Sequence, residues 1–192
     1  MAEDVRKFME ENWIYEANIL GHSMGGKVGM HLALENPDII EKLIVVDIAP
    51  RLYAPGHDQI FKALLNVPIH KLSSRSEIDE SMADYIHNPA VRQFLSKNVM
   101  RNKTGGFDWK MDLFTIHDKY QEVLKAIEYD YPFEKPTLFI KGALSNYILD
   151  SDLPLIEEIF PNFQLRTIND AGHWVHSDKK DELVSSVLEF IL

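Results

Sequence analysis

A serine between two glycines is the first feature with the residue types for covalent catalysis. The run Gly21-His22-Ser23-Met24-Gly25 fits the pattern G-x-S-x-G, in which a tight strand-to-helix turn exposes a serine hydroxyl. We expect the flanking glycines where backbone segments come too close for a Cβ. The backbone N–H of Met24 would point toward a developing oxyanion. Set against a chance glycine-rich turn, this context favours Ser23 as a nucleophile.

A serine nucleophile needs a base, because its hydroxyl is poorly nucleophilic at neutral pH. Among eight histidines, His173 follows the last predicted strand and precedes the last predicted helix. Such a loop lies at the carboxyl edge of a parallel sheet, where open α/β folds place their sites. His176 is the nearby competitor, with an exposed position at a helix start as its alternative explanation. His22 is better explained as part of the packing of the serine turn.

The third member of a serine triad is an acid that orients the imidazole. Asp47 ends the apolar run Leu43–Val46, which is predicted to be the strand after the serine-bearing helix. An unpaired acid in such a run is costly to bury, so Asp47 needs a partner. Asp150 and Asp152 are the alternatives, and helix capping would explain them equally well. The residues favour Asp47 and leave the other two open.

The length and composition of the sequence restrict the kinds of protein that it can be. The 192 residues suffice for one domain with a sizeable core or for two very small ones, and 30 acidic against 20 basic residues give a net charge of −10. That charge argues against nucleic acid or an anionic membrane as a partner. The absence of cysteine excludes disulfides and thiolate metal sites and fits a cytoplasmic location. The histidines, considered separately, show no spacing typical of a metal site.

Apolar runs and helical patterns alternate at both ends of the chain, which predicts βα units around a mostly parallel sheet. The expected strands are residues 17–20, 43–46, 136–140 and 163–168, and the expected helices are residues 2–12, 24–35, 152–160 and 179–192. In the last helix, Leu183, Val187, Leu188 and Ile191 are expected to face inward. Residues 51–131 read as an insertion of short helices without a convincing strand, with a turn at Thr104-Gly105-Gly106. The expected division is therefore a core of residues 1–50 and 132–192 and a helical cap of residues 51–131.

The sequence resembles the α/β-hydrolase superfamily, and more closely the small carboxylesterases of the YbfF type. The resemblance lies in Leu20-Gly21-His22-Ser23-Met24-Gly25-Gly26-Lys27, in Val46-Asp47-Ile48-Ala49-Pro50 and in Gly172-His173-Trp174-Val175-His176. It implies a cofactor-free serine hydrolase acting on a small-molecule acyl ester, with an acyl thioester as the alternative, and with Ser23 as nucleophile, His173 as base and Asp47 as acid. Most superfamily members carry an acid at the position of Ser145, three residues after Gly142, and the serine there is consistent with Asp47 as the acid in this sequence. The insertion would be the cap over the acyl pocket, with Trp109 and Leu113 either lining that pocket or packing in the cap.

The resemblance also raises an expectation about the start of this sequence. Family members carry further strands before the first helix, and a His-Gly-type loop that supplies a second oxyanion N–H. Without them we expect weak esterase activity, and self-association through the open edge of the strand before Ser23. The competing hypothesis is a non-catalytic, hydrolase-like fragment that binds a partner by strand addition.

Overall fold

The computed structural model describes residues 1–103 and 105–192, and it divides the chain into two compact units. The first, called here the core unit, comprises Met1–Leu52 and Lys125–Leu192. The second, the inserted unit, comprises Tyr53–Leu124. Each unit is described by itself below.

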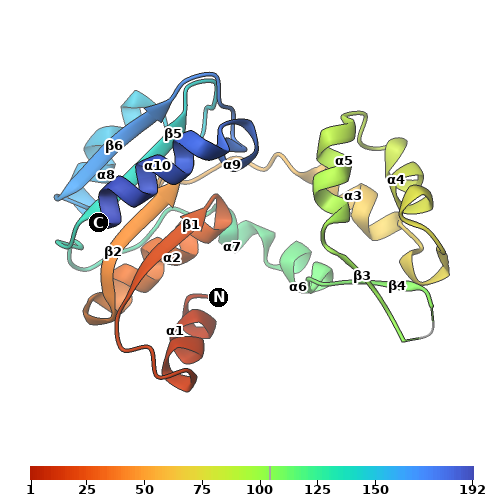
Figure 1. Ribbon diagram of the computed structural model, residues 1–192, viewed down its shortest axis with the longest axis horizontal. Coiled ribbons are helices and arrows are strands. Elements are labelled where there is room, and N and C mark those ends of the chain that lie inside the picture. Colours follow the sequence, from red (N-terminus) through yellow and green to blue (C-terminus); the bar gives the residue numbers. More distant parts are fainter. Residues whose placement is uncertain (104) are drawn as a thin grey trace. The chain divides into compact units, whose positions relative to one another are not determined.

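A four-stranded parallel sheet forms the centre of the core unit, in the order β1-β2-β5-β6 (Figure 1). Its strands are β1 (Ala17–His22), β2 (Ile40–Val46), β5 (Thr137–Gly142) and β6 (Phe163–Ile168). The two central strands are the most apolar and the most buried, because helices cover both of their faces. The predicted α/β class with a mostly parallel sheet is confirmed.

The helices of the core unit follow the strands in the expected alternation. They are α1 (Ala2–Glu11), α2 (Met24–Glu35), α8 (Leu153–Ile159), α9 (Val175–Asp178) and α10 (Lys180–Ile191), with short 3-10 turns η1 (Pro37–Ile39) and η3 (Asp150–Asp152). Side chains of β2 alternate between the two faces. Leu43 and Val45 approach the glycines of α2, whereas Ile44 and Val46 belong to the apolar cluster against which α10 packs. Helices α2 and α10 therefore cover opposite faces of the sheet.

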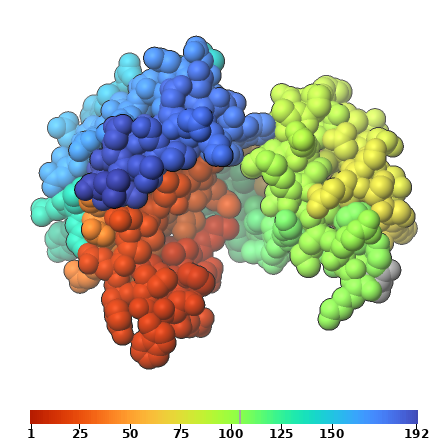
Figure 2. Space-filling view, viewed as in Figure 1, coloured from red at the N-terminus to blue at the C-terminus, as the bar shows by residue number. Residues whose placement is uncertain are grey.

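One prediction for α10 is wrong. Leu183, Val187 and Ile191 pack against the sheet as expected, but Leu188 is 46% exposed. The helix lies at the surface of the core unit, in dark blue in Figure 2, and the 100° rotation per residue turns position 188 away from the stripe of its neighbours.

The inserted unit is built mainly from short helices around its own apolar core. Its elements are α3 (Asp58–Asn66), η2 (Ile69–Lys71), α4 (Arg75–Ala83), α5 (Pro89–Ser96), β3 (Val99–Arg101), β4 (Phe107–Trp109), α6 (Leu113–Asp118) and α7 (Tyr120–Leu124). The fully buried side chains of this core include Ile78, Met82 and Phe107. Trp109 and Leu113 pack with the same cluster.

The expectation that the insertion lacks strands is wrong, because β3 and β4 form an antiparallel hairpin. Strands of three residues are too short to produce a recognisable alternation. Gly105 and Gly106 of the predicted turn connect the two strands, and Gly105 has a φ of +93° that suits glycine. Thr104 of that turn lies outside the described residues.

Candidate active site

The carboxyl ends of the parallel strands bring the candidate residues to one edge of the sheet. Ser23 follows β1 and Asp47 follows β2, both of them directly, while His173 lies between β6 and α9. Register pairing sets His22 beside Val46 and Val46 beside Ile140. This placement is the one that an open parallel sheet gives to functional loops.

Ser23 occupies a strained backbone conformation between β1 and α2. Its φ of 54° and ψ of −121° lie outside the regions that non-glycine residues favour. The Ser23 N–H donates to the carbonyl oxygen of Val46 at 2.9 Å, which fixes the turn to the neighbouring strand. Met24 is the first residue of α2, so its N–H belongs to the amides that have no acceptor within the helix.

The glycines around the turn differ from the expectation in one respect. A Cβ on Gly21 would lie 2.1 Å from the carbonyl oxygen of Gly25, so this position requires glycine. A Cβ on Gly25 would meet nothing within 4 Å, and the expected crowding there is wrong. The crowded residue on the helix side is Gly26, where a Cβ would lie 2.5 Å from Ile48 Cγ2.

Three side chains from these loops form a hydrogen-bonded series. His173 Nε2 lies 2.9 Å from Ser23 Oγ, and His173 Nδ1 lies 2.8 Å from Asp47 Oδ2. A carboxylate accepts hydrogen bonds, so the neutral imidazole carries its proton on Nδ1 and donates it to Asp47. Nε2 is then the acceptor for the Ser23 hydroxyl, which is the tautomer that a general base requires.

Asp47 is fully buried, and each of its oxygens has a donor. Oδ1 accepts from the backbone N–H of Gly142 at 3.0 Å, and Oδ2 accepts from the hydroxyl of Ser145 as well as from His173. Asp47 has a φ of 53°, which for an aspartate is uncommon but accessible. Charge-assisted bonds of this kind offset the cost of burying a carboxylate.

The alternative acids lie elsewhere in the core unit. Asp150 is exposed and pairs with Lys141 at 3.5 Å. Asp152 is buried, pairs with the guanidinium of Arg51 at 3.1 Å and accepts from the Leu149 N–H at 2.8 Å. The structure therefore brings Asp47 to His173 and gives both alternatives other partners.

His22 contacts His173, the residue whose imidazole bonds to Ser23. Its Nε2 donates to the backbone carbonyl of His173 at 2.8 Å, and the two rings are 4.8 Å apart. Burial lowers the pKa of His22 below its usual value, because a charged ring is poorly solvated there. The ring of His176 packs edge-on against His22 at 5.0 Å. His22 thus anchors the loop that presents His173.

Two residues after β5, Ser145 and Tyr147, belong to the surroundings of Asp47 and His173. The sequence marked Ser145 only as a position where superfamily members carry an acid, and it assigned no role to Tyr147. Ser145 donates to Asp47, and the Tyr147 N–H donates to Ser145 Oγ at 3.2 Å. The Tyr147 ring stacks on the His173 imidazole, with 3.8 Å between centroids and 18° between planes. Their position just past the carboxyl end of a central strand was the available signal.

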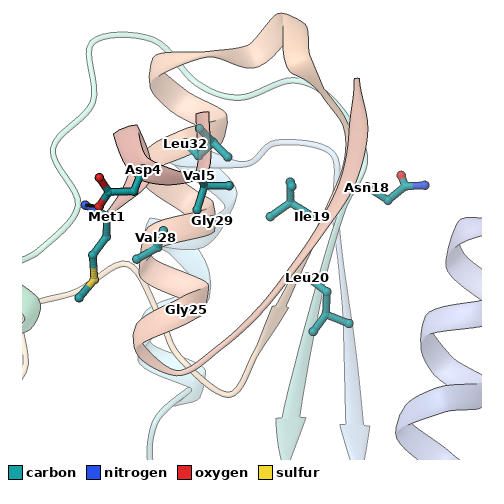
Figure 3. A pocket seen from close by; sticks show the side chains of 10 residues that line it. All are labelled: Met1, Asp4, Val5, Asn18, Ile19, Leu20, Gly25, Val28, Gly29 and Leu32. Atoms are coloured by element: carbon teal, nitrogen blue, oxygen red, sulfur yellow. Dashed lines mark ion pairs between the residues drawn. The ribbon is translucent and has the colours of Figure 1, made fainter. Parts of the chain in front are cut away.

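A hollow beside β1 is separate from these residues. It has a volume of about 580 Å³ and lies between α1, β1 and α2, where Val5, Ile19 and Val28 are among its lining residues (Figure 3). Ser23, Asp47 and His173 do not line it. Within the described part of the chain, no cluster of acids and histidines could hold a metal ion, and no helix is both long and apolar enough to span a bilayer.

A family model and individual related proteins point to the same family for this chain. The family described as "alpha/beta hydrolase fold" matches residues 1–180. The chain is 33% identical to an sn-1-specific diacylglycerol lipase, ABHD11, of Danio rerio, covering 100% of this chain and 62% of that protein. It is 30% identical to esterase YbfF of Escherichia coli, covering 100% of this chain and 73% of that protein.

A solved structure described as a marine microorganism esterase superposes with a TM-score of 0.94 at 39% identity, over 98% of this chain and 75% of that one. The chain spans less than two thirds of the length of the first curated relatives that it matches, such as the Danio rerio lipase. The match over almost the whole of this chain, together with the parallel sheet and the serine turn, identifies its family. The chain belongs to the alpha/beta hydrolase family, as a relative of the YbfF-type esterases.

Proposed function

We propose that this protein hydrolyses acyl esters through an acyl-enzyme intermediate, with Ser23 as nucleophile, His173 as general base and Asp47 as the orienting acid. The observation that carries the proposal is the series of hydrogen bonds from Ser23 Oγ through His173 to Asp47, at 2.9 and 2.8 Å. The similarity of this chain to esterases and lipases supports acyl esters as the substrate class.

In the acylation step, His173 Nε2 accepts the Ser23 proton while Oγ bonds to the carbonyl carbon of the ester. The carbonyl oxygen becomes an oxyanion, for which the Met24 N–H at the start of α2 is the proposed donor. Collapse of the tetrahedral intermediate breaks the bond to the alkoxy group, which leaves as an alcohol with the proton from His173.

In the deacylation step, water takes the place of the alcohol. His173 removes a proton from the water, the hydroxide adds to the acyl carbon, and a second tetrahedral intermediate collapses. The carboxylic acid leaves, and the proton on His173 returns to Ser23 Oγ. Asp47 stays ionised throughout and stabilises the imidazolium, with Ser145 and Gly142 holding its carboxylate in place.

The same site would accept an acyl thioester, since the attacked carbon is again an acyl carbon and only the leaving group differs. We propose esters as the principal class and thioesters as the alternative. The inserted unit would be a cap that selects the acyl group, because its residues are inserted in the sequence between Asp47 and strand β5. The absence of cysteine is compatible with a cytoplasmic location.

A second candidate function is protein interaction without catalysis. Strand β1 lies at the edge of the sheet, and Leu20 on it is half exposed. An open strand edge can pair with a second copy of the chain. Light scattering would then give a mass that rises with concentration and falls in Leu20→Lys, whereas a monomer at every concentration would contradict self-association.

The direct test of hydrolysis is turnover of p-nitrophenyl acyl esters by the purified chain. We expect Ser23→Ala to abolish enzymatic release of nitrophenol, and Ser151→Ala, a change at an exposed serine, to leave it unchanged. Activity that survives in Ser23→Ala would contradict the proposed nucleophile. An inactive but folded wild-type chain would favour the interaction hypothesis.

A further inference from the structure

A buried lysine lies four residues after Ser23. Lys27 belongs to α2, and only 6% of its surface is exposed. Lysine is rarely buried to this degree unless its ammonium group has partners, because desolvation of the charge is costly. The proposed reaction does not use Lys27, so the reason for its burial lies elsewhere.

Lys27 donates to two backbone carbonyls from distant parts of the chain. Its Nζ donates to the carbonyl oxygen of Arg51 at 3.1 Å and to that of Lys125. The core unit ends its first segment at Leu52 and begins its second at Lys125. One side chain of the serine-bearing helix therefore holds both points at which the chain leaves the core unit and returns to it.

The two crossing segments, residues 50–53 and 124–127, also bond to each other. The Ile127 N–H donates to the carbonyl oxygen of Pro50 at 2.7 Å, and the Tyr53 N–H donates to that of Leu124 at 2.9 Å. These bonds form two rungs between the segments. The carbonyls that Lys27 binds belong to residues inside this short ladder, so Lys27 fastens the paired segments as one piece.

The Arg51 side chain fixes the first crossing to the loop after β5. Its Nε donates to Asp152 Oδ2 at 3.1 Å, and its Nη2 lies 3.3 Å from the carbonyl oxygen of Asn146. Asn146 stands between Ser145 and Tyr147, which contact Asp47 and His173. The crossing is thus attached on one side to the helix of Ser23 and on the other to the loop that supports His173.

We propose that Lys27 is a positioning residue, whose side chain clamps the two crossings between the core unit and the inserted unit to helix α2. The clamp keeps the attachment points of the inserted unit fixed with respect to Ser23. Burial, with a smaller effect from Arg51, lowers the pKa of Lys27 to about 8. A neutral amine keeps two N–H donors, as many as the carbonyls of Arg51 and Lys125 require.

The test is amide hydrogen exchange of the folded chain, in Lys27→Met and in a matched control. Lys42→Met is that control, because Lys42 Nζ also donates to two carbonyls, those of Phe190 and Ile191 at 3.0 and 3.1 Å. We expect Lys27→Met to raise exchange at Tyr53 and Ile127 by about tenfold or more, with no such change in Lys42→Met. Equal exchange at these amides in wild type and Lys27→Met would overturn the proposal.

A kinetic comparison separates positioning from general stability, and only this part rests on the proposed esterase function. We expect Lys27→Met to raise KM for long-chain esters several-fold and to change kcat for acetyl esters little, with Lys27→Arg restoring much of the affinity. An equal loss of kcat on every ester would contradict the proposal. If the wild type has no esterase activity, the proposed function fails while the exchange result still decides the clamp.

The proposal stays testable if Lys27→Met does not fold. In the wild-type chain, the clamp requires the Tyr53 and Ile127 amides to exchange far more slowly than unprotected peptide amides. Exchange of both at the unprotected rate would overturn it without any variant.

Discussion

The phenol ring of Tyr147 lies flat against the imidazole of His173, with 3.8 Å between their centroids and 18° between their planes. The stack covers one face of the ring whose two nitrogens bond to Ser23 and Asp47. An aromatic face also favours a positively charged neighbour, so the contact stabilises the imidazolium that forms during the proposed reaction.

Tyr147→Ala is therefore expected to lower kcat by about tenfold, because an interaction of this kind is worth about 1 kcal/mol or more. Tyr147→Phe keeps the ring and should retain most of the wild-type kcat. Steady-state kinetics on a short-chain ester provides the measurement. If the two variants lose activity equally, the hydroxyl matters and the stacking account is wrong.

Asp47→Asn should reduce kcat by about 10³–10⁴-fold, since an amide no longer holds the base in the required tautomer. Asp152→Asn is the matched comparison, because this acid is also buried but bonds to Arg51 and Leu149. We expect it to lose much less. A larger loss of kcat in Asp152→Asn than in Asp47→Asn would contradict the role of Asp47 as the acid of the triad.

The glycines of the serine turn give a prediction about stability. Gly21→Ala would force a Cβ to within 2.1 Å of a backbone oxygen, whereas Gly25→Ala would meet nothing within 4 Å. We expect Gly21→Ala to lower the free energy of unfolding by about 3 kcal/mol or more, and Gly25→Ala to change it by less than about 1 kcal/mol. Denaturant unfolding of the two variants measures this difference, and equal losses would contradict it.

His22 predicts a specific dependence of stability on pH. Burial lowers its pKa in the folded state below the usual 6.5, so the unfolded chain binds the proton more readily. As pH falls through 6.5 toward the folded-state pKa, this group therefore removes stability, by at most about 1.4 kcal/mol per pH unit.

His22→Gln keeps an N–H donor for the carbonyl of His173 but does not titrate. The melting temperature of wild type should fall more between pH 6.5 and 5.5 than that of His22→Gln, as measured by thermal unfolding. If the melting temperatures of the two proteins change with pH in the same way, the titration of His22 does not affect stability and the prediction is wrong.

The order of the core elements could be predicted from the sequence because each strand is a short apolar run next to a helical pattern. The strand-to-helix turn at Ser23 was visible from its glycines, and the parallel sheet then brought Asp47 and His173 to the same edge. The order of strands and helices indicates which loops lie at this edge of the sheet. It does not determine which side chains of those loops contact one another.

What could not be predicted depends on the path of loops. The contacts of Ser145 and Tyr147 follow from the turn after β5, which has no periodic pattern to reveal it. The crowded position on the helix side proved to be Gly26 and not Gly25, because crowding depends on the packing of Ile48. The carbonyl partners of Lys27 lie 24 and 98 residues away, beyond the reach of any local pattern.

The most direct test of the central claim is covalent labelling of the intact chain by a fluorophosphonate, read by intact mass. The probe reacts with a serine that an adjacent base has activated. The account predicts one adduct per chain, with Ser23→Ala unlabelled and Ser151→Ala labelled as wild type. A folded wild-type chain without an adduct, or an adduct that persists in Ser23→Ala, would contradict it.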